Sequence, residues 1–303
     1  MKKSLYIAKQ ERVSRLKKTI FRVFAVCFCL CLCAIFMVAV EASAEERGYD
    51  FPAGSASVSV YYEGRQILAE ESAIIDSVTY VPLRAFSEQL GAESVTWNQS
   101  TKTATVKKGG ISINITDKAS YIEASGRILY SPTGIKNIND RLFVPIRPLA
   151  SALSFDVEWD GATRSVLVSE SQRPFASASQ FYNDTDLYWL SRIISAEARG
   201  EPFLGKIAVG NVVLNRKASS AYPNTVYGVI FDRKHGTQFS PVSYGTIYNT
   251  PTAESVIAAK ICLEGYTLSD SIIFFVNPKY ATSNWISSTR PFAFRIGDHY
   301  FYK

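Results

Sequence analysis

The stretch that decides the C-terminal half of this chain is residues 194–216, which read ISAEARGEPFLGKIAVGNVVLNR. Two glutamates, Glu197 and Glu201, stand four positions apart among apolar and small residues that are expected to pack. A carboxylate at a packed position needs a partner, a proton or a function, because burying an uncompensated charge costs several kcal/mol. The sequence on either side indicates a different answer for each glutamate.

Glu197 falls on the apolar stripe of the helix expected before this stretch. Asp184 or Thr185 can cap that helix. Its apolar residues recur every three or four positions and are Leu187, Leu190, Ile193 and Ile194. Glu197 is the next member of the stripe, at the carboxyl end, where an apolar wall and the helix dipole both favour a protonated carboxyl. Such a group suits a general acid for glycosidic cleavage, and a salt bridge with Arg192 or Arg199 is the alternative.

Glu201 stands in a different position. It follows Gly200 and directly precedes Pro202, where the chain breaks before a second helix expected over residues 203–217. That helix is dense in Ala, Val, Gly and Leu, which predicts that it is largely buried. An acidic residue beside a helix N-terminus is favoured by the dipole. Glu201 is therefore expected to be a first-turn acid or cap of the second helix, with a direct part in catalysis or substrate binding as the alternative.

The first 44 residues have the pattern of a secretory signal peptide. Eight Lys and Arg residues lie before an unbroken apolar run over residues 23–40, and Ala42-Ser43-Ala44 then supplies a small-residue cleavage pattern. We expect cleavage after this segment and a secreted protein of the cell wall or spore envelope. An uncleaved membrane anchor is the alternative, because the apolar run of 18 residues is just long enough to span a bilayer.

The rest of the chain gives no support for several classes of function. Residues 45–303 carry 25 basic and 25 acidic residues, so nucleic-acid binding driven by net charge loses its support. Cys262 is the one cysteine there, which excludes an internal disulfide, and its helical context predicts a buried, inert thiol. His235 and His299 stand 64 residues apart and form no HExxH-like pair, so we expect neither a zinc site nor any cofactor.

An internal repeat organises the N-terminal half. YVPLR at residues 80–84 recurs as FVPIR at residues 143–147. A short helical stretch follows each copy, and a tryptophan-centred pair of strands then surrounds Trp97 or Trp159. Two units of strand, helix and hairpin therefore predict one accessory domain over residues 56–170.

The repeated V-P-[LI]-R, short helix and W-x-x-x-x-[KR]-x-[AV] pattern resembles the copper amine oxidase N-terminal-like domain. The resemblance implies an accessory module of exported bacterial proteins that binds the cell wall. It does not imply copper here, because both histidines of residues 45–303 lie outside the domain. Arg84 and Arg147 are expected to bind locally across the repeat. Residues 171–183, SQRPFASASQFYN, lose periodicity and predict a linker.

Residues 184–303 carry five motifs in a fixed order. AEARGEPFLGKIAVGNVVLNR resembles the [GA]-E-A-R-G-E-P-x-x-G-x-x-A-V-x-x-V-x-L-N-R signature of the SleB/CwlJ cell-wall hydrolases, the spore-cortex-lytic enzyme family. The further matches are YPNTVYGVIF (222–231), TQFSPVSYG (237–245), FFVNPKYATSNW (274–285) and RIGDHYFYK (295–303). Tyr244 departs from the pattern, since many members carry an acidic residue there.

This resemblance implies a mostly helical, lysozyme-like catalytic domain with a short β element over residues 184–303, and hence a two-domain α+β chain. It also implies cleavage of peptidoglycan glycan strands, typically as a lytic transglycosylase. Glu197 would protonate the oxygen between N-acetylmuramic acid and N-acetylglucosamine and then take the proton of the muramoyl C6 hydroxyl, which closes an anhydro ring. One carboxylic acid suffices for this route. Hydrolysis by water is the alternative if Glu201 or Asp232 approaches.

The remaining motifs predict a substrate groove that binds peptidoglycan. Gln238 and Ser240 lie in a Gly- and Pro-punctuated loop or hairpin and suit hydrogen bonds to acetamido groups, and Asn277 presents an amide after the strand-like run 272–276. Aromatic faces for stacking sugar rings are offered by Phe239, Tyr248, Tyr280 and Trp285. Residues 292–302 predict a closing hairpin in which His299 is structural. A non-catalytic wall-binding protein with a degenerate hydrolase domain is the remaining alternative.

Overall fold

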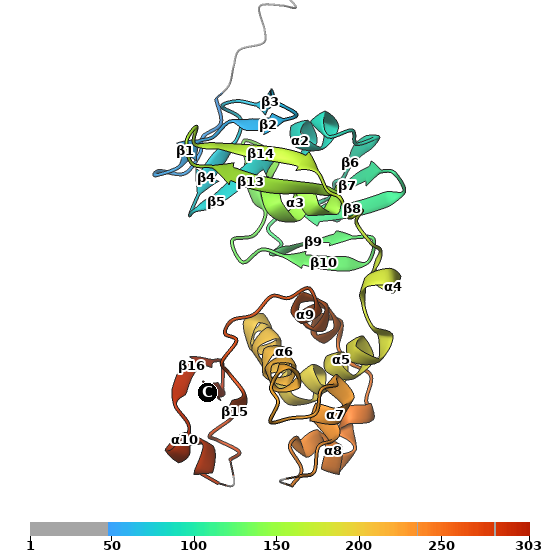
Figure 1. The fold of residues 1–303 in the computed structure, drawn as a ribbon, viewed down its shortest axis with the longest axis vertical. Coiled ribbons are helices and arrows are strands. Elements are labelled where there is room, and N and C mark those ends of the chain that lie inside the picture. The colour runs from blue at the N-terminus through green and yellow to red at the C-terminus, as the bar shows by residue number, and fades with distance from the viewer. Residues whose placement is uncertain (1–47, 235, 282) are drawn as a thin grey trace, which may run out of the picture. The chain divides into compact units, whose positions relative to one another are not determined.

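The computed structural model describes residues 48–234, 236–281 and 283–303. The predicted signal peptide and His235 lie outside the described residues. A β-rich N-terminal region is followed by a mostly helical C-terminal region with a short sheet (Figure 1). This order confirms the predicted α+β class. Within the described part of the chain, no helix combines the length and the apolar character that crossing a membrane requires.

Three sheets make up the β-rich region in the described residues. The first, in spatial order, is β1 Ala56–Ser57, β4 Ala73–Ile75, β5 Val78–Pro82, β12 Arg141–Pro145 and β11 Lys136–Ile138. The second is β10 Arg127–Tyr130, β9 Tyr121–Ala124, β8 Ile111–Thr116, β7 Thr103–Lys108 and β6 Ser94–Asn98. The third is β13 Phe155–Asp160, β14 Ser165–Glu170, β2 Val60–Tyr62 and β3 Arg65–Leu68. Most of their buried apolar side chains share one core with the two short helices α2 Leu83–Gln89 and α3 Ile146–Ala152. A second, smaller cluster on the first sheet contains Ala73, Ile75, Tyr80, Ile138 and Phe143.

The two V-P-[LI]-R motifs meet at the centre of the first sheet. Strands β5 and β12 pair antiparallel, with Val81 opposite Val144. Each strand runs directly into its helix through a proline, Pro82 for α2 and Pro145 for α3. Proline suits this junction because the first turn of a helix leaves its N–H groups without helical partners. Antiparallel pairs follow the helices, β6 with β7 and β13 with β14.

The helical region begins after a short segment that contains α4 Ala178–Phe181. Its longer helices are α5 Asp184–Ala198, α6 Phe203–Ala218 and α9 Ala253–Leu263. Its shorter ones are α7 Val226–Phe231, α8 Ser240–Tyr244, the 3-10 turn η1 Thr246–Tyr248 and α10 Trp285–Thr289. The cap of α5 is Asn183, whose side chain accepts a hydrogen bond from the backbone N–H of Asp186, and not Asp184 or Thr185 as predicted.

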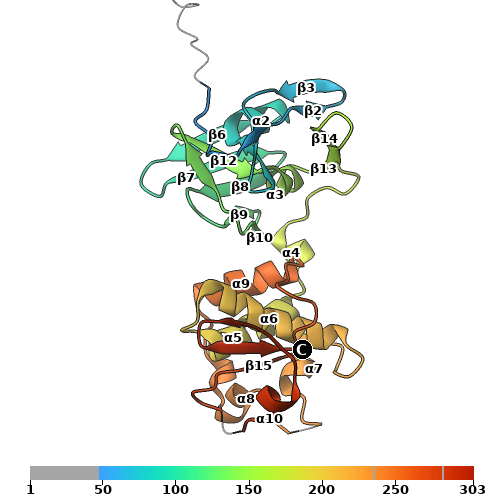
Figure 2. The same ribbon diagram turned by 90° about the vertical axis from the view of Figure 1, so that its left-hand side faces the viewer.

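Close packing of α6 on α5 and α9 forms the core of this region (Figure 2). Gly210 of α6 makes it possible, because an added Cβ would lie 2.6 Å from the Cys262 sulfur on α9 and 2.9 Å from Ile194 Cδ1 on α5. The sheet beside the helices has the order β15 Phe274–Val276, β17 His299–Tyr302 and β16 Phe292–Ile296. Strands β16 and β17 form the closing hairpin that the sequence predicts.

Candidate active site

Glu197 lies in the last turn of α5, where the helix gives way to the turn at Gly200. Its side chain is partly buried, as the apolar stripe predicts. Burial of the carboxyl raises its pKa to about 7, and the positive charge of Arg216 opposes that rise. A carboxyl with this pKa holds a proton on a large fraction of molecules at neutral pH. Glu197 can therefore donate a proton and accept one back, which is what a general acid and base requires.

Arg216 of α6 is the charged partner that sequence analysis missed. Its guanidinium is buried, and its Nε donates a hydrogen bond of 2.7 Å to the carbonyl of Ile273. It also lies against the rings of Tyr222, Phe239 and Phe274, at 5.2, 5.1 and 5.5 Å from their centroids. The predicted alternative partners of Glu197 are placed elsewhere. Arg192 stacks on Tyr188 at 3.6 Å, and Arg199 is exposed.

Two asparagines of α6 hold the segment that leads into β15. Asn211 donates to the carbonyl of Tyr266 at 2.9 Å and accepts from the N–H of Leu268 at 3.0 Å. Asn215 donates to the carbonyls of Ser269 and Ile272 at 2.9 and 2.8 Å. Because Arg216 bonds the next carbonyl, three polar side chains of one helix fix the start of this strand. The sequence signal for them was the motif GNVVLNR, which contains all three residues.

Glu201 does not cap α6, so that prediction was wrong. Pro202 occupies the cap position of α6. The carboxylate of Glu201 instead accepts a hydrogen bond of 3.0 Å from the backbone N–H of Asp298. That residue follows Gly297, which adopts the left-handed conformation (φ 57°) at the turn between β16 and β17. Glu201 thereby anchors the closing hairpin, and its oxygen is engaged before any substrate arrives.

The segment around Gln238 differs from the sequence prediction in two respects. Phe239 is 3% exposed and packs beneath Arg216, so it cannot offer a face to a sugar. Gln238 is half-buried, and its amide donates to the carbonyl of Gly236 at 3.2 Å. Ser240 is exposed and begins α8, so the predicted loop or hairpin is a short helix at this point.

The aromatic and amide groups predicted around β15 lie at the surface. Trp285 is 49% exposed at the start of α10, and its ring meets Phe274 edge-on with centroids 5.9 Å apart. Tyr280 is 72% exposed. Asn277 follows β15, and its side-chain oxygen accepts from the N–H of Lys279 at 3.0 Å. Tyr248 is also exposed and lies beside Trp189.

A chain of contacts connects part of this set to Arg216, whose charge acts on Glu197. Arg216 touches Phe239, which stands between Gln238 and Ser240, and it also touches Phe274, which supports Trp285. Among the described residues, no hydrogen bond or ion pair extends this chain to Tyr280 or Asn277.

The other candidate groups for catalysis are the Cys262 thiol, the His299 imidazole and a bound metal ion. The Cys262 sulfur is buried and donates to the carbonyl of Ile207, and burial raises the pKa of its thiol. His299 is buried beside Phe275, and burial lowers its pKa, in keeping with a structural role. Over the described ranges, no group of three or more His, Cys, Asp or Glu side chains gathers closely enough to hold a metal ion.

Comparison with known families matches both halves of the chain. Residues 200–302 match the model of the cell wall hydrolase family, and residues 61–168 match that of the copper amine oxidase N-terminal domain. The spore cortex-lytic enzyme of Bacillus cereus is 39% identical over 122 residues, which are 40% of this chain and 46% of that protein. The same enzyme of Halalkalibacterium halodurans is 41% identical over 120 residues, which are 40% of this chain and 35% of that protein.

A solved structure also matches. It is the catalytic domain of the germination-specific lytic transglycosylase SleB from Bacillus anthracis, 38% identical, with 40% of this chain and 97% of that one covered and a TM-score of 0.37. The chain spans less than half the length of the curated spore cortex-lytic relatives named above. The matched ranges nonetheless correspond to the two regions described above: residues 61–168 fall in the β-rich region, and residues 200–302 fall in the helical region.

Proposed function

We propose that this protein cleaves peptidoglycan glycan strands between N-acetylmuramic acid and N-acetylglucosamine as a lytic transglycosylase. The observation that carries the proposal is the placement of Glu197, a partly buried carboxyl with a pKa of about 7 at the end of α5. The names of the matched relatives, spore cortex-lytic enzyme and lytic transglycosylase, give the same substrate class. We further propose secretion to the cell wall or spore envelope and a lysozyme-like fold for residues 184–303.

The proposed reaction needs one carboxyl group. Protonated Glu197 donates its proton to the glycosidic oxygen as the bond to the muramoyl C1 breaks. The carboxylate left behind stabilises the positive charge that develops at C1 and then removes the proton of the muramoyl C6 hydroxyl. The C6 oxygen bonds to C1, so an anhydro ring forms and Glu197 regains its proton. No water is consumed, which distinguishes this route from hydrolysis with two carboxylates.

Arg216 supports both halves of this cycle. Its charge stabilises the carboxylate form of Glu197, which keeps the pKa of Glu197 from rising above about 7. A pKa near the working pH gives both protonation states a useful population, as a group that acts first as acid and then as base requires.

The groove residues remain part of the proposal. We assign Gln238 and Ser240 to acetamido groups, and Trp285 and Tyr280 to stacking on sugar rings, because these side chains are at least partly accessible. Asn277 is assigned to polar contacts beside Tyr280. Glu201 contributes indirectly by holding the hairpin, since its carboxylate is bonded to Asp298.

Replacing Glu197 by glutamine tests the proposal. Loss of the acid is expected to reduce the solubilisation of purified peptidoglycan by at least about 10²-fold. The matched control is Glu123→Gln, which changes an exposed glutamate of the β-rich region. Mass spectrometry of the released fragments is expected to show anhydromuramoyl ends. Reducing muramoyl ends would replace the proposed route by hydrolysis, and equal turbidity loss by Glu197→Gln and the parent would refute the role of Glu197.

A further inference from the structure

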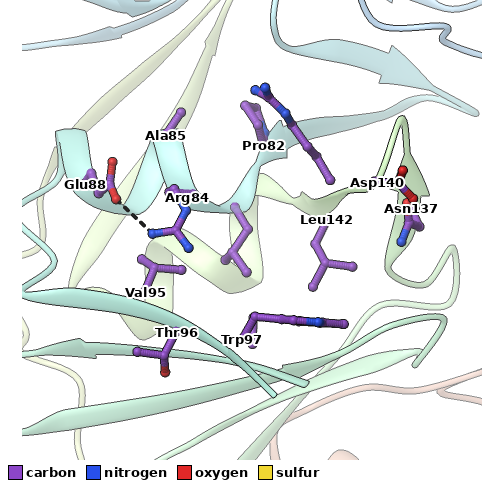
Figure 3. Close-up of a pocket in the computed structure, with 13 residues that line it drawn as sticks. Pro82, Arg84, Ala85, Glu88, Val95, Thr96, Trp97, Asn137, Asp140 and Leu142 are labelled. Atoms are coloured by element: carbon purple, nitrogen blue, oxygen red, sulfur yellow. Dashed lines mark hydrogen bonds and ion pairs between the residues drawn. The ribbon is translucent and has the colours of Figure 1, made fainter. Parts of the chain in front are cut away.

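Two hollows in the β-rich region have the same construction. The first has a volume of about 490 Å³ and lies between the start of α2, the β6–β7 pair and the turn joining β11 to β12 (Figure 3). The second has a volume of about 530 Å³ and lies between the start of α3, the β13–β14 pair and the turn joining β4 to β5. Both volumes fall in the range of about 300–1,000 Å³ that small-molecule sites occupy.

Equivalent positions of the two sequence repeats line the hollows. Arg84 and Trp97 line the first, and Arg147 and Trp159 line the second. Each hollow takes its helix and hairpin from one repeat and its turn from the other, because β5 and β12 pair side by side and antiparallel. A feature built twice by the same repeat unit is a property of that unit and not an accident of one loop.

A partly uncovered tryptophan stands in each hollow. Trp97 is 44% exposed and Trp159 is 42% exposed, whereas the region buries many smaller apolar side chains completely. In Figure 3 the Trp97 ring lies at the base of the first hollow and Leu142 of β12 points toward it. The indole N–H of Trp97 is already bonded to the Gln99 side chain at 2.7 Å, so the ring is held in place. A fixed aromatic face beside polar groups suits the C–H face of a sugar ring.

The charged groups that line each hollow sum to zero, so they provide no net attraction for a polyanionic ligand. The first holds Arg84 and Arg141 together with Glu88 and Asp140, and the second holds Arg147 with Glu158, so each is balanced. Arg84 is paired with Glu88 at 3.3 Å. Arg147 donates to a backbone carbonyl on β13 at 2.9 Å. Because neither hollow has an excess of positive charge, neither favours a phosphate polymer.

We propose that these two hollows, the tryptophan pockets, bind the neutral amino-sugar chain of peptidoglycan, with one sugar ring stacked on Trp97 and another on Trp159. The identity of the glycan as peptidoglycan rests on the proposed function of the hydrolase domain. Two pockets on one domain can engage two segments of a repetitive polymer, so their contributions reinforce each other through a high effective concentration.

Sedimentation with insoluble peptidoglycan tests the tryptophan pockets. All variants carry Glu197→Gln in the chain of residues 45–303, so that the polymer is not degraded during the measurement. Trp97→Ala and Trp159→Ala are each expected to weaken binding by about threefold to tenfold, the usual size of an aromatic contact, and the double variant by roughly the product. The matched control is Leu167→Ala, which removes a 39% exposed apolar side chain that lines neither pocket.

Three further measurements make the outcome decisive. Trp97→Phe and Trp159→Phe keep an aromatic face and are expected to retain most of the binding, which separates stacking from a general loss of fold. Chitin oligosaccharides, as neutral amino-sugar probes, are expected to compete with the wall for the parent but not for the double variant. Cleavage of short soluble glycan strands by Leu167→Ala with Glu197 intact is expected to be unchanged, which shows that the control variant folds normally.

Several results would overturn the inference. Equal binding by the double alanine variant and its parent would do so, as would binding that disappears when wall teichoic acid is stripped from the peptidoglycan. These outcomes do not depend on the catalytic role of Glu197, because every variant in the binding measurement carries Glu197→Gln. Failure of Glu197 to matter for cleavage would refute the proposed function and leave the binding result standing.

Discussion

One charged site in each region of the chain shows how burial changes the effect of a charge. In the β-rich region Arg84 and Glu88 pair at the surface, with side chains 60% and 53% exposed. In the helical region Arg216 is 5% exposed and affects the pKa of the partly buried Glu197. Water screens the Arg84–Glu88 pair, so the pair contributes little to the free energy of unfolding. The low dielectric around Arg216 lets its single charge change the pKa of Glu197 measurably. The difference distinguishes the region proposed to bind glycan from the region proposed to transfer a proton.

Removing the buried charge of Arg216 is expected to have the largest effect on stability and on the pH dependence of activity. Arg216→Gln removes the guanidinium that donates to the Ile273 carbonyl and that lies against three aromatic rings. We therefore expect the free energy of unfolding to fall by roughly 2–4 kcal/mol. The same change removes the charge that opposes the raised pKa of Glu197. The alkaline limb of the pH–rate profile is therefore expected to move to higher pH.

Arg216→Lys serves as the control for charge. It keeps a cation and is expected to leave the alkaline limb near its parental position even if stability falls. Denaturant unfolding and the pH dependence of kcat/KM on soluble glycan fragments give the two readouts. An alkaline limb that does not move in Arg216→Gln would show that Arg216 acts on structure alone.

The pH dependence of stability offers a second test. The pKa of Glu197 is about 7 in the folded protein, above its ordinary value of 4.5. The folded state therefore binds the proton more tightly, and the stability that this gives is lost as the pH rises toward and through 7. At pH 8 Glu197→Gln is expected to be more stable than the parent by about 1–3 kcal/mol, and this advantage should vanish below pH 4.

Thermal or urea unfolding at pH 4 and pH 8 measures this effect. Glu123→Gln, at an exposed position, is the matched control and should show no such pH-dependent difference. A constant offset between Glu197→Gln and the parent at both pH values would contradict the raised pKa.

A smaller effect is expected at the closing hairpin. Glu201→Ala removes the acceptor of the Asp298 N–H and should destabilise the protein by about 1–2 kcal/mol. Glu201→Gln keeps an oxygen acceptor and should recover most of that loss. Hydrogen exchange of the β16–β17 amides locates the change, and a Glu201→Ala variant with parental protection would show that the hairpin does not need this anchor.

The smallest effect is predicted in the β-rich region. Arg84→Ala removes an exposed pair four residues apart on α2, and such pairs contribute about 0.3–0.5 kcal/mol. A double-mutant cycle with Glu88→Ala measures the interaction. A coupling above roughly 1 kcal/mol would remove the contrast between the two regions.

The candidate site was predictable where it depends on neighbours in sequence. The three- and four-residue spacing of Ile193, Ile194 and Glu197 placed a carboxyl on the buried face of a helix, and its pKa agrees with that placement. Phe239 shows the limit of the same method. It was expected to face a sugar, yet it is buried against Arg216, because a short segment of mixed character does not reveal which side meets the core.

The sequence by itself determined the order of the elements, the class of each region and the position of Glu197 on its helix, because helix and strand periodicity are local properties of the backbone. The tertiary structure decided which groups meet. Arg216 comes from the next helix, and Glu201 binds the N–H of Asp298, which is 97 residues away. Each tryptophan pocket combines segments of both repeats. Such contacts arise from the packing of the whole chain, and no local pattern encodes them.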